Sequence, residues 1–224
     1  MANEWYRRKS WTKADEHDFF LRLSRARKDG RAQYLKIQAI ELMETQDPAL
    51  LSVAESLLNR ILIDFPDDRL ERSQTLASLG SIYRTRGDAE KAIVYFEKAV
   101  AFEKEFPNVI VGAKLDYAEM VVETGRTDRY DEVEHDLLGE LSRGGLIFPA
   151  ELYTIGSVLA IISAYKGNAH KTLEYATLAD QNARAKSNTF WNSKKRHLGL
   201  VSERRSKLVE LVIDALQSMS NSAN

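Results

Sequence analysis

The sequence predicts an all-α fold, arranged as an α-solenoid of antiparallel helix pairs. Apolar residues recur at spacings of three and four along most of the 224 residues, and alternating strand patterns are nearly absent. Glycine and proline interrupt this periodicity and divide the chain into nine or ten predicted helices. Gly87, Gly125 and Gly167 each end one predicted helix and precede another, at spacings of 38 and 42 residues. A helix pair repeated at this interval is typical of an α-solenoid.

The N-terminal part, residues 1–30, is expected to combine a basic and aromatic segment with one helix. Thr12 is a suitable N-cap for that helix, and Asp15 stands at its third position. Gly30 is predicted to end the helix in the left-handed conformation. After a second helix, Asp47-Pro48 supplies a cap followed by proline at the first helical position, where no backbone N–H is needed.

The rest of the chain continues the same alternation of helices and breaks. Residues 31–186 are predicted to form about four helix pairs, and consecutive helices joined by short turns pack antiparallel. A basic amphipathic capping helix is expected over residues 187–219, where apolar residues again follow helical spacing. Residues 220–224 are expected to form a disordered tail.

Composition and charge exclude several classes of protein. The chain has no cysteine, which excludes disulfides, thiol catalysis and cysteine-bearing zinc sites. No apolar run reaches the roughly 20 residues that span a bilayer, so a soluble, cytoplasmic protein without a membrane partner is expected. The formal net charge of -1 is a cancellation: residues 1–37 carry +5, residues 38–183 carry -11, residues 184–207 carry +7 and residues 208–224 carry -2. Such a partition indicates electrostatically selected contacts.

Residues 73–106 place large and small side chains at set positions of two helices around a glycine turn. These positions are occupied by Leu76, Leu79, Gly80, Tyr83, Gly87, Ala92, Phe96 and Ala99. The pattern resembles the tetratricopeptide repeat (TPR) family, in which short side chains let paired helices approach closely and aromatic rings fill the space between pairs. Residues 35–68, 111–147 and 153–186 keep parts of the same pattern, the second of these three with a short insertion around residues 127–130.

The resemblance implies a non-catalytic scaffold, such as an adaptor, a chaperone or an inhibitor. It would bind a partner protein or peptide on a concave face lined mainly by the first helix of each pair. Carried onto this chain, the pattern gives these partner-binding residues: Lys36, Ala39, Met43, Gln74, Ala77, Ser81, Arg84, Leu115, Glu119, Val122, Thr154, Ser157, Ile161 and Tyr165. Ala77 and Ser81 argue against the co-chaperones of the family that grip a C-terminal carboxylate, because those use Lys, Asn and Arg in the groove. The alternative is that several of these side chains pack against the terminal helices.

No catalytic, metal or cofactor site is predicted. His17, His135, His170 and His197 are scattered, and none is spaced with a second ligand as a metal site on a helix requires. Gly144-Gly145 lacks the preceding strand and following lysine of a phosphate-binding loop, and is interpreted as a helix terminator. The protein is therefore expected not to be an enzyme and to use no cofactor.

Two basic and aromatic segments leave several functions open. One contains Trp5, Tyr6, Arg7, Arg8 and Trp11, and the other contains Lys194, Lys195 and Arg196 beside Phe190 and Trp191. They could bind a nucleic-acid backbone and stack on bases, which would make the protein a nucleic-acid-binding regulator. They could instead close the ends of the solenoid, or contact an acidic partner protein. The acidic middle suggests one specific role, an immunity-type or antitoxin-type inhibitor that covers the basic active site of a nuclease-like toxin.

Overall fold

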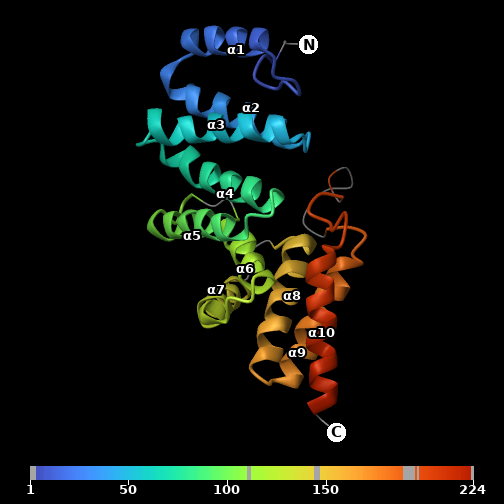
Figure 1. Ribbon diagram of the computed structural model, residues 1–224. Helices are drawn as coiled ribbons and strands as arrows, with labels where there is room; N and C mark the ends of the chain where they lie inside the picture. Colours follow the sequence, from blue (N-terminus) through green and yellow to red (C-terminus); the bar gives the residue numbers. More distant parts are fainter. Residues whose placement is uncertain (1–3, 110–111, 144–146, 189–194, 196, 223–224) are drawn as a thin grey trace. The chain divides into compact units, whose positions relative to one another are not determined.

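The computed structural model describes residues 4–109, 112–143, 147–188, 195 and 197–222. Within these residues every regular element is a helix (Figure 1), which confirms the all-α class. The chain divides into two compact units, residues 1–113 and residues 114–224. Each unit is described by itself.

Unit 1 is a succession of helices with one apolar core. Its elements are α1 (Lys13–Arg25), the 3₁₀ turn η1 (Lys28–Gly30), α2 (Arg31–Met43), α3 (Pro48–Asp64), α4 (Arg69–Thr85) and α5 (Ala89–Glu105). α2 packs against α3 and α4, α3 packs against α4, and α4 packs against α5. Phe19, Leu35, Leu58 and Leu79, from four successive helices, are fully buried in the same cluster. Burying each such side chain contributes about 1.5–3 kcal/mol.

The start of α1 confirms the predicted cap. The Thr12 side chain accepts a hydrogen bond from the Asp15 backbone N–H at 3.2 Å, and the Asp15 carboxylate accepts one from the Thr12 backbone N–H at 2.9 Å. The Asp15 carboxylate accepts hydrogen bonds from the Thr12 backbone, the Thr12 hydroxyl and the Arg8 side chain, and together they lower the pKa of Asp15 to about 2. The predicted cap of α3 is confirmed too, since the Asp47 side chain accepts hydrogen bonds from the backbone N–H groups of Ala49 and Leu50, and Pro48 begins the helix.

The prediction for Gly30 is wrong. Gly30 has φ -99° and stands before α2, while α1 has already ended at Arg25 with an extended residue, Ala26. The Arg31 side chain donates hydrogen bonds to the carbonyl oxygens of Ala26 and Ser24, at 3.1 and 2.6 Å. Those carbonyls at the end of α1 are therefore satisfied by a side chain, and no left-handed residue is required.

The three glycines that suggested the repeat all adopt the left-handed conformation. Gly87, Gly125 and Gly167 have φ values of 76°, 65° and 73°, and each follows the end of a helix, as predicted. After Gly87 and Gly167 the next helix starts within two residues. After Gly125 a 3₁₀ turn, η2 (Thr127–Arg129), comes first, at the position of the predicted insertion.

Unit 2 is organised around one helix that is buried almost all round. Its elements are α6 (Ala113–Glu123), η2, α7 (Tyr130–Ser142), α8 (Pro149–Tyr165), α9 (Ala169–Ala183) and α10 (Ser206–Ser222). Every residue of α8 from Tyr153 to Ala164 is buried. α7, α9 and α10 each pack against α8. A helix with apolar residues on all sides must be covered on all sides, and α8 is the core of this unit for that reason.

The C-terminal region differs from its predicted boundaries. α10 begins at Ser206, so the helix expected over residues 187–219 is shorter at its start. It extends to Ser222, so residues 220–222 of the expected tail are helical. Residues 223–224, Phe190, Trp191 and Gly144-Gly145 lie outside the described residues. None of the described helices is long and apolar enough to cross a membrane.

Candidate partner-binding face

In the predicted helix pairs of unit 1, α2 and α4 are the first members. These two helices pack against each other and carry the accessible part of the predicted concave face. The half-buried members are Lys36, Met43, Gln74, Ser81 and Arg84, here called the α2–α4 face. The side chains of Ala39 and Ala77, predicted on the same surface, are buried. The face combines a flexible thioether, two neutral hydrogen-bonding groups, the guanidinium of Arg84 and a lysine, Lys36, that forms an ion pair with Glu71. That mixture matches a peptide with apolar, polar and acidic side chains.

An ion pair joins α2 to the start of α4. Lys36 Nζ lies 2.5 Å from Glu71 Oε2, and both side chains are largely buried. Close by in sequence, buried Ser73 donates a hydrogen bond to Glu103 of α5 at 3.3 Å, and Glu103 also accepts the Ala113 backbone N–H at 3.4 Å. Buried carboxylates are retained only where such partners neutralise or solvate them. The polar groups therefore fix the register of α2, α4 and α5 beneath the face.

The predicted positions on α8 are mostly inaccessible. Thr154, Ser157 and Ile161 are buried, and only Tyr165 is exposed, at 63%. The Tyr165 ring packs edge-on against Tyr130 at the start of α7, with centroids 5.1 Å apart. A partner could reach the three buried side chains only if the helices around α8 separated.

The predicted positions on α6 are divided in the same way. Leu115 is half-buried, whereas Glu119 and Val122 are buried. The buried Glu119 carboxylate forms an ion pair with Arg205, which directly precedes α10. Glu119 therefore neutralises a residue of its own chain.

The N-terminal aromatic residues fold back on α1 and α2. Trp5 packs against Phe19 of α1 and Tyr34 of α2, with ring centroids 5.2 and 5.1 Å apart. Tyr6 packs on Tyr34 at 4.8 Å, and Trp11 packs on Phe19 at 5.3 Å. Of the interpretations left open by the sequence, this packing favours the one in which the segment closes the end of the helices, because the three rings contact α1 and α2.

The basic residues of the first segment are paired within the chain. Arg7 lies 2.7 Å from Glu41, and Arg8 forms ion pairs with Asp15 and Asp18. In the second segment Lys195 is exposed, whereas Lys194 and Arg196 lie outside the described residues. The cationic surface of the N-terminal segment is therefore smaller than its count of basic residues suggests.

A network of polar and aromatic side chains connects α3 to the end of α4. The Tyr83 hydroxyl donates to Glu55, and Arg86 also binds Glu55 at 2.5 Å. Burial alone would raise the pKa of Glu55, but these two hydrogen bonds, together with the positive charges of Arg86 and Lys91, lower the pKa. The hydrogen bond to Glu55, together with burial, raises the pKa of Tyr83 to about 12. The Tyr83 ring stacks on Tyr95 of α5, so this network fixes three helices together.

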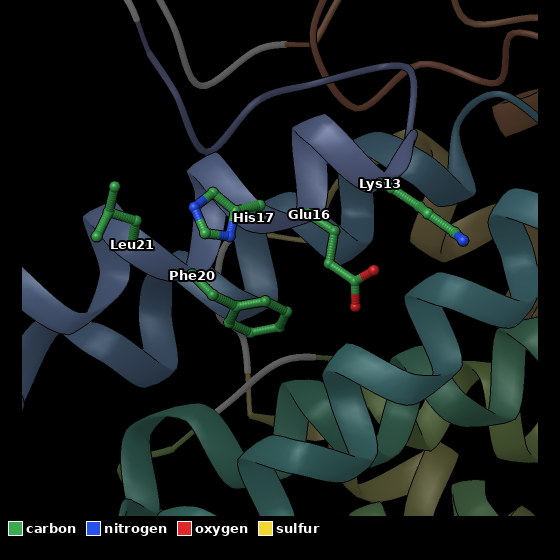
Figure 2. A pocket seen from close by; sticks show the side chains of 5 residues that line it. All are labelled: Lys13, Glu16, His17, Phe20 and Leu21. Carbon is green, nitrogen blue, oxygen red and sulfur yellow. The ribbon is translucent and has the colours of Figure 1, made fainter.

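One open hollow of about 460 Å³ lies on α1 (Figure 2). Its lining residues are Lys13, Glu16, His17, Phe20 and Leu21, all from one face of that helix. A small molecule there would be held from one side only, which differs from the enclosed pockets that bind ligands tightly. No group of three or more His, Asp or Glu side chains among the described residues could hold a metal ion.

Neither a family model, nor a curated protein, nor a solved structure matches this chain. The assignment of function therefore depends on the residues and geometry of the chain itself.

The sequence did not point to Glu71, Glu103 or Arg205 as important residues. Glu103 continues the buried stripe of Phe96 and Ala99, and Glu71 that of Thr75 and Leu79, so helical spacing is the signal that could have marked both as buried. Arg205 stood out only as one of several basic residues. Its pairing with Glu119 depends on how α10 returns to the unit, which local sequence does not encode.

Proposed function

We propose that this chain is a non-catalytic protein-binding module of the TPR type, which holds a peptide or protein segment against the α2–α4 face. The observation that carries the proposal is the packing order of unit 1. α2 touches both α3 and α4, and α4 touches both α3 and α5. In this order the first helices of successive pairs are neighbours, as the resemblance of residues 73–106 implies for a solenoid.

The composition of the face supports a protein ligand. Met43 offers an adaptable apolar contact, Gln74 and Ser81 offer hydrogen bonds, and Arg84 offers a cation in the last turn of α4. Arginine is enriched at the energetic centres of interfaces. A segment with an acidic residue opposite Arg84 and an apolar residue opposite Met43 fits this arrangement.

The experiment compares two charge reversals in affinity co-purification from the cell of origin. Arg84→Glu reverses a charge on the α2–α4 face, and Lys104→Glu reverses an exposed charge on the second helix α5. Partners retained by the wild-type chain and by Lys104→Glu should be lost with Arg84→Glu. Equal retention by both variants, with unchanged circular dichroism, would refute binding on this face.

An inhibitor of a basic nuclease-like toxin is a narrower form of the same proposal. Residues 38–183 carry a net charge of -11, and Asp131 at the start of α7 exposes 91% of its side chain. Charge of this sign speeds and selects the encounter with a basic partner. Co-purification with the product of a neighbouring gene, weakened by raised salt, is the expected result. Failure to form any complex with such a product would end this narrower form.

A further inference from the structure

α10 covers a first helix instead of extending the stack. It runs beside α8 and α9 (Figure 1) and packs more extensively on α8 than on α9. A helix that continued the repeat would do the reverse, as α4 does in unit 1, where it packs more on α3 than on α2. α10 thus lies where a bound helical ligand of α8 would lie.

Two arginines fix the start of α10. Arg205 forms an ion pair with Glu119, whose side chain is completely buried. Arg204 donates a hydrogen bond to Asp180 of α9 at 3.0 Å. Tyr153 of α8 lies against the same segment: burial raises its pKa, while the Arg205 backbone N–H and the Arg204 charge oppose that rise. A buried carboxylate without a cation is costly, so this surface selects for an arginine at the start of whatever helix it holds.

Few side chains in the rest of α10 are fully buried. Leu208 and Ala215 are buried, while Leu211, Val212 and Leu216 are half-buried and Ile213 is 47% exposed. The chain before α10 is fastened separately, because the Ala150 backbone N–H donates to the Gly199 carbonyl at 2.8 Å. α10 can therefore leave while Gly199 keeps this hydrogen bond to Ala150. Elements with few buried apolar contacts are the ones that open locally.

We propose that the surface under α10, with Glu119 at its edge, is a second binding surface, here called the α10 seat. Its ligand is an amphipathic helix with an arginine directly before its first turn and apolar residues at i, i+3, i+4 and i+7. α10 is the intramolecular occupant, and a partner helix of the same chemistry binds by displacing it. This proposal does not depend on the α2–α4 face.

The test uses a labelled peptide of residues 200–222 and the full chain, followed by fluorescence anisotropy. Leu208→Ala in the chain removes the most deeply buried contact of α10 and raises the fraction of open seats. Because apparent affinity scales with the open fraction, the peptide should bind Leu208→Ala at least roughly tenfold more tightly than wild type. A peptide carrying Arg205→Ala should bind at least roughly tenfold more weakly than the wild-type peptide, since it removes this cation from the buried Glu119 carboxylate.

Three controls make the result decisive. Ile213→Ala in the chain changes an exposed side chain of α10 and should leave the affinity unchanged. Arg84→Glu should also leave it unchanged, which separates this proposal from binding on the α2–α4 face. If Leu208→Ala loses its helical circular dichroism, Arg205→Ala in the chain replaces it as the opening variant, because that side chain is 45% exposed. The proposal is overturned if the peptide fails to bind a folded opening variant, or binds no better than a scrambled peptide.

Discussion

The helix pairs α4–α5 and α8–α9 share one local design. Gly87 and Gly167 end the first helix of each pair in the left-handed conformation. Asp88 and Asn168 then cap the second helix by accepting a backbone N–H three residues on. Each first helix also carries a glycine at its closest approach to the second, Gly80 in α4 and Gly156 in α8.

The two pairs differ in what those glycines touch. A Cβ on Gly80 would meet the Phe96 ring at 2.8 Å, whereas a Cβ on Gly156 would meet backbone atoms of Tyr175 and Ala179 at 2.8 Å. An aromatic ring thus separates α4 from α5, while α8 and α9 lie backbone against backbone. α4 keeps half-buried side chains along one edge, and α8 is buried from Tyr153 to Ala164. The same local design therefore supports an accessible face in one unit and a covered core in the other.

The largest effect is expected for Gly156→Ala. The new methyl group would press on the α9 backbone, which cannot move aside as a side chain can. Overpacking of this kind costs about 2–3 kcal/mol, more than the roughly 1 kcal/mol that alanine gains over glycine in a helix. Urea unfolding followed by circular dichroism measures the change. An unchanged or higher midpoint would show that α8 and α9 are further apart than described.

Arg205→Ala is expected to destabilise unit 2 by about 1–2 kcal/mol. The variant leaves the buried Glu119 carboxylate without this cation, but Arg205 is partly solvated, so the loss is smaller than for a fully buried pair. The double variant with Glu119→Gln should recover most of the loss in the same unfolding measurement. Equal stability of the single and double variants would contradict the pairing.

Gly80→Ala is expected to cost about 1 kcal/mol, less than the same change at Gly156. The Phe96 ring can rotate slightly away from the new methyl group, because only a side chain opposes it. In a Phe96→Leu background, where the ring is absent, the cost of Gly80→Ala should be smaller still. If Gly80→Ala proved as damaging as Gly156→Ala, the distinction between the two helix pairs would fail.

The smallest effect concerns the two caps. Hydrogen bonds from the Lys91 side chain and backbone N–H lower the pKa of Asp88 below its ordinary 3.8. The stability this adds is present above about pH 4 and is lost as the pH falls through the lowered pKa. Asp88→Asn should therefore reduce the loss of stability as the pH falls below about 4. Stability at pH 7 should change little, because both residues cap well. Asn168→Asp should increase the loss of stability over the same pH range. Unfolding temperatures measured between pH 2 and pH 7 compare the two variants.

Local features of the fold were predictable because they depend on neighbouring residues. The caps at Thr12 and Asp47 and the left-handed glycines each follow from side-chain chemistry within a few positions. Gly30 was predicted wrongly because Arg31 satisfies the same carbonyls by a different route. The helical class follows from periodicity summed over many residues, which tolerates such local errors.

Burial on α6 and α8 was not predictable from the same signals. Thr154, Ser157 and Glu119 match positions that a repeat would leave open, yet they are buried. All sides of α8 are apolar, a local signal that marks Thr154 and Ser157 as buried. The pairing of Glu119 instead depends on the return of α10 from a distant part of the chain. On α2 the N-terminal segment covers Tyr34 and Glu41 but leaves Lys36 and Met43 half-buried, so part of the predicted face stayed accessible.

The burial of α8 also sets an order of events during synthesis. α8 leaves the ribosome before α9 and well before α10, the last of the helices that cover it. Until the residues of α10 emerge, a strongly apolar helix has only part of its cover, and such intermediates are the ones that aggregate or recruit chaperones. Premature stops between α9 and α10 should therefore yield insoluble chains, even though every residue of α8 is present.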